Sequence, residues 1–189
     1  MPEIHTPGLS MRTLFALAAL VLAAVPAAAQ ARTTSGPIIH SAGAVFAVPS
    51  PDFPTPADGE YKLAFELAEA APSPDRLNTS LNTVARFLNM HGQAGVPAER
   101  IHAAVVYHGP AAFELLDDEA YRARHGVDNP NAELIRELIG TGAKVILCGQ
   151  TAAARGVPTD HLVEGVEVAL SAMTAFVVLQ QEGYRVNPW

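Results

Sequence analysis

The chain has 189 residues, of which 12 are basic and 19 acidic, so its formal net charge is −7. An acidic chain without basic clusters is poorly suited to nucleic acid or to anionic membrane surfaces, and we expect neither as a partner. The single cysteine, Cys148, excludes an internal disulfide, so the hydrophobic core alone must stabilise the fold.

The first 29 residues have the layout of a secretory signal peptide. Arg12 precedes an uncharged apolar run over residues 14–25, and small residues follow it. The run is too short for a membrane-spanning helix, which needs about 20 residues, so an uncleaved anchor is the weaker interpretation. Cleavage after Ala29 and cleavage after Ala31 fit equally well. The mature protein is therefore predicted to be periplasmic or secreted, with no stable membrane insertion once the signal is cleaved.

Residues 30–58 form a second segment, rich in Pro, Ser, Gly and Thr. This composition predicts an extended arm with a short strand around residues 44–48. We expect such an arm either to extend into solvent or to wrap a neighbouring subunit.

The remaining residues, 59–189, alternate between apolar runs and helical patterns. Strands are expected at 61–70, 101–109, 143–148, 166–171 and 184–188. Helices are expected at 75–92, 129–142, 151–156 and 173–183, with short helical pieces over 111–126. In the 129–142 helix, Asn129 is the expected cap. The apolar strands lack alternation, which predicts an α/β fold whose parallel sheet is covered on both faces.

Functional residues are expected where these strands end, because binding sites of open α/β sheets lie beyond the carboxyl ends of the strands. The strand tips carry His108 and Gly109, then Cys148 and Gly149, and finally Ser171. A helix or turn follows each tip, so backbone N–H groups point at this edge and favour a negative charge there.

Cys148 has two possible roles. A single cysteine is often a small buried hydrophobe, but a cysteine at a strand-to-helix corner can be an activated thiolate. His108 is likewise either a proton shuttle that pairs with the thiol or a histidine hydrogen-bonded at the sheet edge. No phosphate-binding loop and no metal-binding pattern occurs in the sequence, so neither a cofactor nor a metal is expected.

Several short motifs occur in an order that resembles the DsrE/DsrF-like family, and specifically its secreted branch. They are "HGPA" from residue 108, "NPN" from residue 129, "CGQ" from residue 148, and "SAMTA" followed by "LQQEGY" from residue 171. The resemblance covers about residues 60–188. It implies a three-layer α/β/α fold with a five-stranded parallel sheet in the order 4-3-2-1-5.

The resemblance also implies a chemistry. Sulfur-relay relatives carry sulfur as a persulfide on a cysteine and work as homo- or hetero-oligomers, so a homo-oligomer and a sulfur-donor or acceptor protein are the expected partners. In this chain only Cys148 can carry the sulfur. His108 would assist it, and Gly109, Gly149, Gln150 and Ser171 would line its pocket. If the protein has an activity, it is sulfurtransferase-like.

Two features depart from the relay members. Those members are cytoplasmic, whereas this chain is predicted to be exported, and their sulfur-carrying cysteine is not always at the "CGQ" position. Two other functions therefore stay open. One is a non-catalytic oligomeric binding or scaffold protein in which Cys148 is a structural, buried residue. The other is a small-molecule pocket at the same edge without covalent chemistry.

Overall fold

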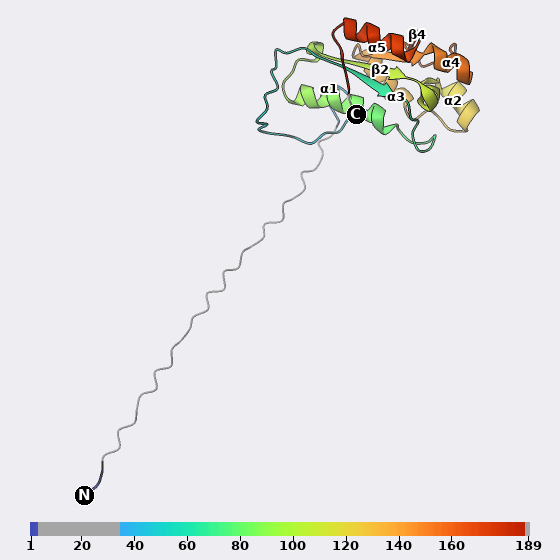
Figure 1. The fold of residues 1–189 in the computed structure, drawn as a ribbon. Helices are drawn as coiled ribbons and strands as arrows, with labels where there is room; N and C mark the ends of the chain where they lie inside the picture. Colours follow the sequence, from blue (N-terminus) through green and yellow to red (C-terminus); the bar gives the residue numbers. More distant parts are fainter. Residues whose placement is uncertain (4–34, 188–189) are drawn as a thin grey trace.

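A computed structural model of the chain describes residues 1–3 and 35–187 (Figure 1). Apart from its first three residues, the predicted signal peptide lies outside the described residues, as does Trp189. Within the described part, no helix is both long enough and apolar enough to cross a bilayer.

A five-stranded sheet forms the centre of the molecule. All strand pairs are parallel and the order is β4-β3-β2-β1-β5, which confirms the predicted fold class and strand order. The strands are β1 (Tyr61–Leu67), β2 (Ile101–Tyr107), β3 (Lys144–Cys148), β4 (Glu167–Ala169) and β5 (Arg185–Val186). The helices are α1 (Thr79–Gln93), α2 (Asp118–His125), α3 (Ala132–Gly140), α4 (Gly149–Arg155) and α5 (Ala172–Gln181). Two 3₁₀ segments, η1 (Ala98–Arg100) and η2 (Gly109–Leu115), flank β2.

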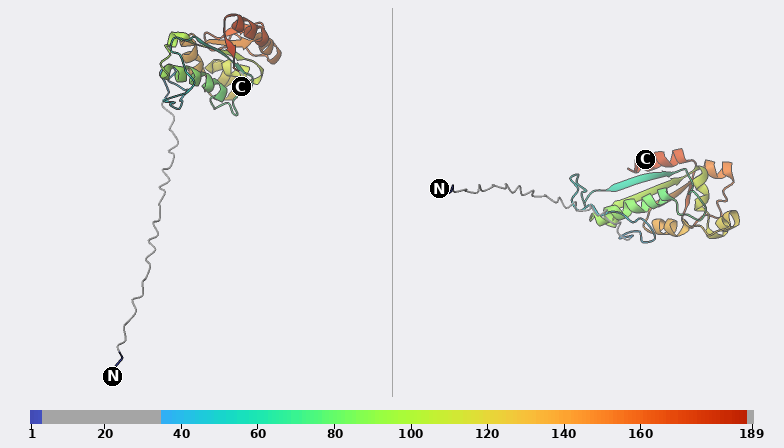
Figure 2. Two further views of the ribbon diagram at one scale, coloured as in Figure 1. Left: turned by 60° about the vertical axis from the view of Figure 1, so that its left-hand side comes forward. Right: turned by 90° about the horizontal axis from the view of Figure 1, so that it is seen from below.

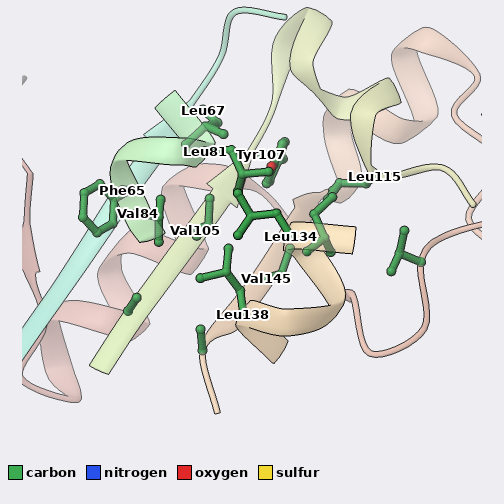
Figure 3. Close-up of a cluster of buried hydrophobic side chains, with 14 of the residues drawn as sticks. Phe65, Leu67, Leu81, Val84, Val105, Tyr107, Leu115, Leu134, Leu138 and Val145 are labelled. Carbon is green, nitrogen blue, oxygen red and sulfur yellow. The ribbon is translucent and has the colours of Figure 1, made fainter. Parts of the chain in front are cut away.

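The two faces of the sheet are covered by different helices, as Figures 1 and 2 show with α5 on one side of the strands and α1 on the other. Because side chains alternate along a strand, Val105 and Tyr107 of β2 face the large core formed with α1 and α3 (Figure 3). Ala104 and Val106 face a smaller core formed with α5. The apolar runs of the central strands follow from this double burial.

The first part of the predicted arm packs against its own domain. The side chain of Asn89, on α1, is fully buried. Its Oδ1 accepts the N–H groups of residues 38 and 39, and its Nδ2 donates to the carbonyls of residues 39, 42 and 43. Glu137 of α3 accepts N–H groups from His40 and Ser41. Residues 38–43 therefore neither extend into solvent nor require a neighbouring subunit, and the strand expected at 44–48 does not form.

Element ends differ from the predictions by a few residues. The first two strands end at Leu67 and Tyr107, shorter than predicted, and α4 begins directly after Cys148. Asn129 does not cap α3, which begins at Ala132. The Asn129 side chain instead donates to the carbonyls of Glu114 and Leu116. These hydrogen bonds connect η2 to the start of α3. They join residues far apart in the chain, so the local sequence does not predict them.

Candidate functional site

The tips of β2 and β3 bring His108 and Cys148 onto the same face of the sheet. The last paired residues are Tyr107 and Leu147, so His108 and Cys148 follow side by side on strands about 4.8 Å apart. Ile146 faces α5, and Cys148, two residues further on, lies on that same face. The topology therefore places the two predicted catalytic residues at one edge.

The thiol of Cys148 occupies the cap position of α4 and accepts the backbone N–H of Thr151 at 3.4 Å. Burial raises the pKa of this thiol. The hydrogen bonds from the side chain and backbone of Thr151, and from the backbone N–H groups of Ala172 and Gln150, lower it by more, so the pKa lies below its ordinary value. Cys148 is only 5% exposed. The site therefore stabilises a thiolate that is largely screened from solvent.

His108 makes its closest polar contact with Glu66, not with Cys148. Its Nε2 atom lies 2.8 Å from Oε1 of Glu66, which projects from β1 on the face that α5 covers. His108 is not among the groups that shift the pKa of Cys148. Of the two roles expected for His108, the contact matches the histidine hydrogen-bonded at the sheet edge.

Ser171 and Gln150 act near the thiol through the backbone. Ser171 is buried and caps α5, with its Oγ accepting the N–H of Thr174 at 3.0 Å. This cap orients the first turn of α5, from which the N–H of Ala172 reaches the thiol. Gln150 is exposed and contributes its N–H group.

The two glycines of the predicted pocket allow close backbone approach. A Cβ at Gly149 would lie 2.6 Å from the carbonyl oxygen of Ala169, so only glycine lets α4 pack against the end of β4. Gly109 has φ +56° and donates its N–H to Oγ1 of Thr151 at 3.4 Å. Both glycines therefore hold in place the backbone that surrounds Cys148.

The family model for the DsrE/DsrF-like family matches residues 54–188. The chain belongs to the DsrE/DsrF-like family. The match begins within the Pro-rich segment and runs through the whole sheet, so the site described above lies inside the family domain.

A solved structure shares the fold of this DsrE/DsrF-like protein. The protein MTH1491 from Methanobacterium thermoautotrophicum, of unknown function, is 23% identical with a TM-score of 0.50, covering 68% of this chain and 98% of its own. The ychN protein from E. coli is 18% identical with a TM-score of 0.48, covering 67% of this chain and 97% of its own. No curated protein matches the chain.

Three groups at the site were not found from the sequence: Thr151, the N–H of Ala172, and Glu66. Thr151 is the third residue after Cys148, and a helix cap accepts the backbone N–H at that spacing, so the sequence could have predicted this contact. The other two approach from α5 and β1, and only the sheet order and register bring them to the thiol and to His108. Among the described residues, no group of three His, Cys, Asp or Glu side chains could hold a metal ion.

Proposed function

We propose that this DsrE/DsrF-like protein carries sulfane sulfur as a persulfide on Cys148. The observation that carries the proposal is the thiol environment, in which N–H groups from two helices lower the pKa of Cys148 despite its burial. A persulfide needs a nucleophilic thiolate to form, and its negative outer sulfur is stabilised by the same donors. Membership of the family supports a role related to sulfur relay.

The transfer step needs no external oxidant. The Cys148 thiolate attacks the outer sulfur of a donor persulfide, R–S–SH, and a new S–S bond forms at Cys148 while the S–S bond of the donor breaks. The donor leaves as R–S⁻ and takes up a proton, and Cys148 holds –S–SH. Delivery to an acceptor thiolate repeats the exchange in the opposite sense.

His108 is the proposed proton donor to the departing donor thiolate. It lies next to Cys148 across the β2–β3 pair, and its contact with Glu66 fixes the ring in place. A positioned histidine of this kind transfers protons near neutral pH. In this proposal Glu66 is a positioning residue, because it acts through His108.

The test uses polysulfide as the sulfur source with folded protein. We expect mass spectrometry to show one added sulfur on Cys148, removed by dithiothreitol and absent from Cys148→Ser. A charged alkylating reagent added to the native protein reports whether the thiol is reachable. If Cys148 reacts with both reagents only after denaturation, the sulfur-carrier proposal fails.

The second candidate is a non-catalytic oligomeric binding or scaffold protein. The burial of Cys148 favours it, because a cysteine 5% exposed is reached only if the covering segments move. In that case Cys148→Ala would leave the assembly and its partners unchanged. The labelling experiment separates the two candidates, since only the carrier requires a reactive native thiol.

Export is also part of the proposal, with the periplasm or the extracellular space as the destination and no stable membrane insertion after cleavage. The support is the sequence of residues 1–29, with a basic residue, an apolar run and small residues in order. Mass spectrometry of protein from the native host should find an N-terminus between Gln30 and Arg32. An intact N-terminus would refute export.

We further propose a homo-oligomer assembled through α5 and β4. Leu170 is 72% exposed and lines a hollow beside the outer edge of β4, and Met173 and Val177 of α5 are also exposed, by 78% and 54%. Among the described strands, β4 pairs with β3 alone, and an apolar patch next to an open strand edge favours association. A second copy is the proposed occupant, and a sulfur-donor or acceptor protein would use the neighbouring thiol edge.

A further inference from the structure

A pocket of about 330 Å³ lies beyond the carboxyl ends of β1, β2 and β3, apart from the residues assigned to the thiol site. Its walls come from the loop after β1, from η2, from α2 and from the end of α4. The volume is at the lower end of the range for small-molecule sites, so the pocket suits a small ligand.

The walls of this pocket are held by hydrogen bonds that need no ligand. The buried carboxylate of Glu114 accepts the N–H of Ala71 at 2.6 Å and the Nδ2 group of Asn78 at 2.8 Å. Tyr121 of α2 donates its hydroxyl to the carbonyl of Pro74 at 2.9 Å. The loop over residues 70–74 is therefore fixed against η2 and α2, and the pocket is preformed.

Two arginines line the pocket without a carboxylate partner among the described residues. The guanidinium of Arg124 stacks 3.5 Å from the ring centroid of Phe113, and Arg155 projects from the last turn of α4. By contrast, Arg122, two residues before Arg124 on the same helix, pairs with Asp128 outside the pocket. Stacking on the ring orients the guanidinium and leaves its N–H groups available to an anion.

Other titratable groups lie at or beside the pocket. Burial raises the pKa of Glu114, and its oxygens are already occupied by Ala71 and Asn78. Asp75 accepts the hydroxyl of Ser73. Burial, followed by the charge of Arg124, lowers the pKa of His125, whose ring nitrogens can form hydrogen bonds.

We propose that this pocket binds a small organic carboxylate, with its anionic head at Arg124 and Arg155 and its apolar body against Phe113 and Tyr121. A guanidinium group matches the bidentate geometry of a carboxylate, and two of these groups line the pocket. The rings of Phe113 and Tyr121, with the prolines of the loop, supply the apolar lining. Binding does not depend on Cys148, which does not line the pocket.

The test is fluorine NMR titration of the full mature chain with para-fluorobenzoate. We expect saturable binding that weakens about tenfold or more in the double variant Arg124→Gln/Arg155→Gln, because two charge-assisted contacts are lost. The matched control, Arg122→Gln, removes an arginine from the same helix but not from the pocket and should bind as the wild type does. Both pocket arginines are exposed, so folding is retained and is checked by circular dichroism.

Two further probes separate charge from shape. The neutral isostere para-fluorobenzamide should bind much more weakly than para-fluorobenzoate, and inorganic phosphate should displace para-fluorobenzoate only at far higher concentration, since it lacks an apolar body. Equal affinity of wild type and double variant, equal affinity for the amide, or equally effective displacement by phosphate would each overturn the proposal.

Discussion

The imidazole of His108 and the carboxylate of Glu66 lie 2.8 Å apart, on the sheet face that also carries Cys148. This contact links the end of β2 to β1, while the thiol on β3 takes its hydrogen bonds from α4 and α5. The histidine and the cysteine are therefore neighbours with separate sets of partners. Activation of the thiol and transfer of protons are expected to respond to different mutations.

Replacing His108 should slow sulfur transfer without changing the acidity of the thiol. We expect His108→Ala to leave the Cys148 pKa unchanged within about half a unit, because backbone N–H groups and Thr151 determine it. Glu66→Gln should also slow sulfur transfer. The measurements are the pH dependence of alkylation and the rate of persulfide formation. A large rise of the thiol pKa in His108→Ala would show that the imidazole activates Cys148 directly.

The lowered pKa of Cys148 also predicts a pH dependence of stability. A group whose folded pKa is depressed stabilises the fold fully above its unfolded value, about 8.5 for a thiol, and this contribution is lost as the pH falls through the folded pKa. The wild type should therefore gain stability relative to Cys148→Ser as the pH rises from the folded pKa toward 8.5. Urea unfolding across this range measures the difference, and parallel curves would refute the depressed pKa.

Gly149→Ala should destabilise the protein by about 1–3 kcal/mol, because the new Cβ would lie 2.6 Å from the carbonyl oxygen of Ala169, a backbone atom that cannot rotate away. The matched control is Gly140→Ala, at the end of α3, where no atom lies within 4 Å of the new Cβ. That change should be neutral or stabilising. Urea unfolding of both variants provides the comparison, and equal stabilities would contradict the close approach.

Asn89→Ala should release residues 38–43 from the domain. The substitution leaves two backbone N–H groups without their acceptor in a buried setting, at a cost of about 2 kcal/mol or more. Limited proteolysis should then cut within this segment sooner than in the wild type. Thr83→Ala is the control, because Thr83 is a half-buried residue of the same helix whose hydroxyl donates to Thr79 within that helix. An unchanged cleavage rate in Asn89→Ala would mean that other contacts hold the segment.

A charge introduced into the α5 surface should dissociate the proposed oligomer. We expect Val177→Asp to shift the mass from light scattering to that of a monomer, since Val177 is 54% exposed on the apolar face. The control Glu133→Lys changes charge on α3, on the opposite side of the sheet, and should leave the mass unchanged. A wild-type monomer at tens of micromolar would refute the oligomer itself.

The sequence by itself determined the sheet. Apolar runs such as residues 101–107, bounded by helices with clear amphipathic faces, specify buried parallel strands because both signals are local and repeat along the chain. The same local signals predicted that Cys148 and Gly149 lie at a strand tip. Helix and strand ends were less well predicted, since long-range contacts such as those of Asn129 decide where a helix begins.

Only the tertiary structure decided which groups meet. The N–H of Ala172 reaches the thiol from α5, and Glu66 reaches His108 from β1. The partners in each contact are far apart in the chain, and no periodic pattern in the sequence predicts that they meet. The same holds for Asn89, which docks residues 38–43 on α1 instead of leaving them as an extended arm. Each of these contacts depends on the distance and direction between packed elements, and those follow from how the whole chain buries its apolar surface.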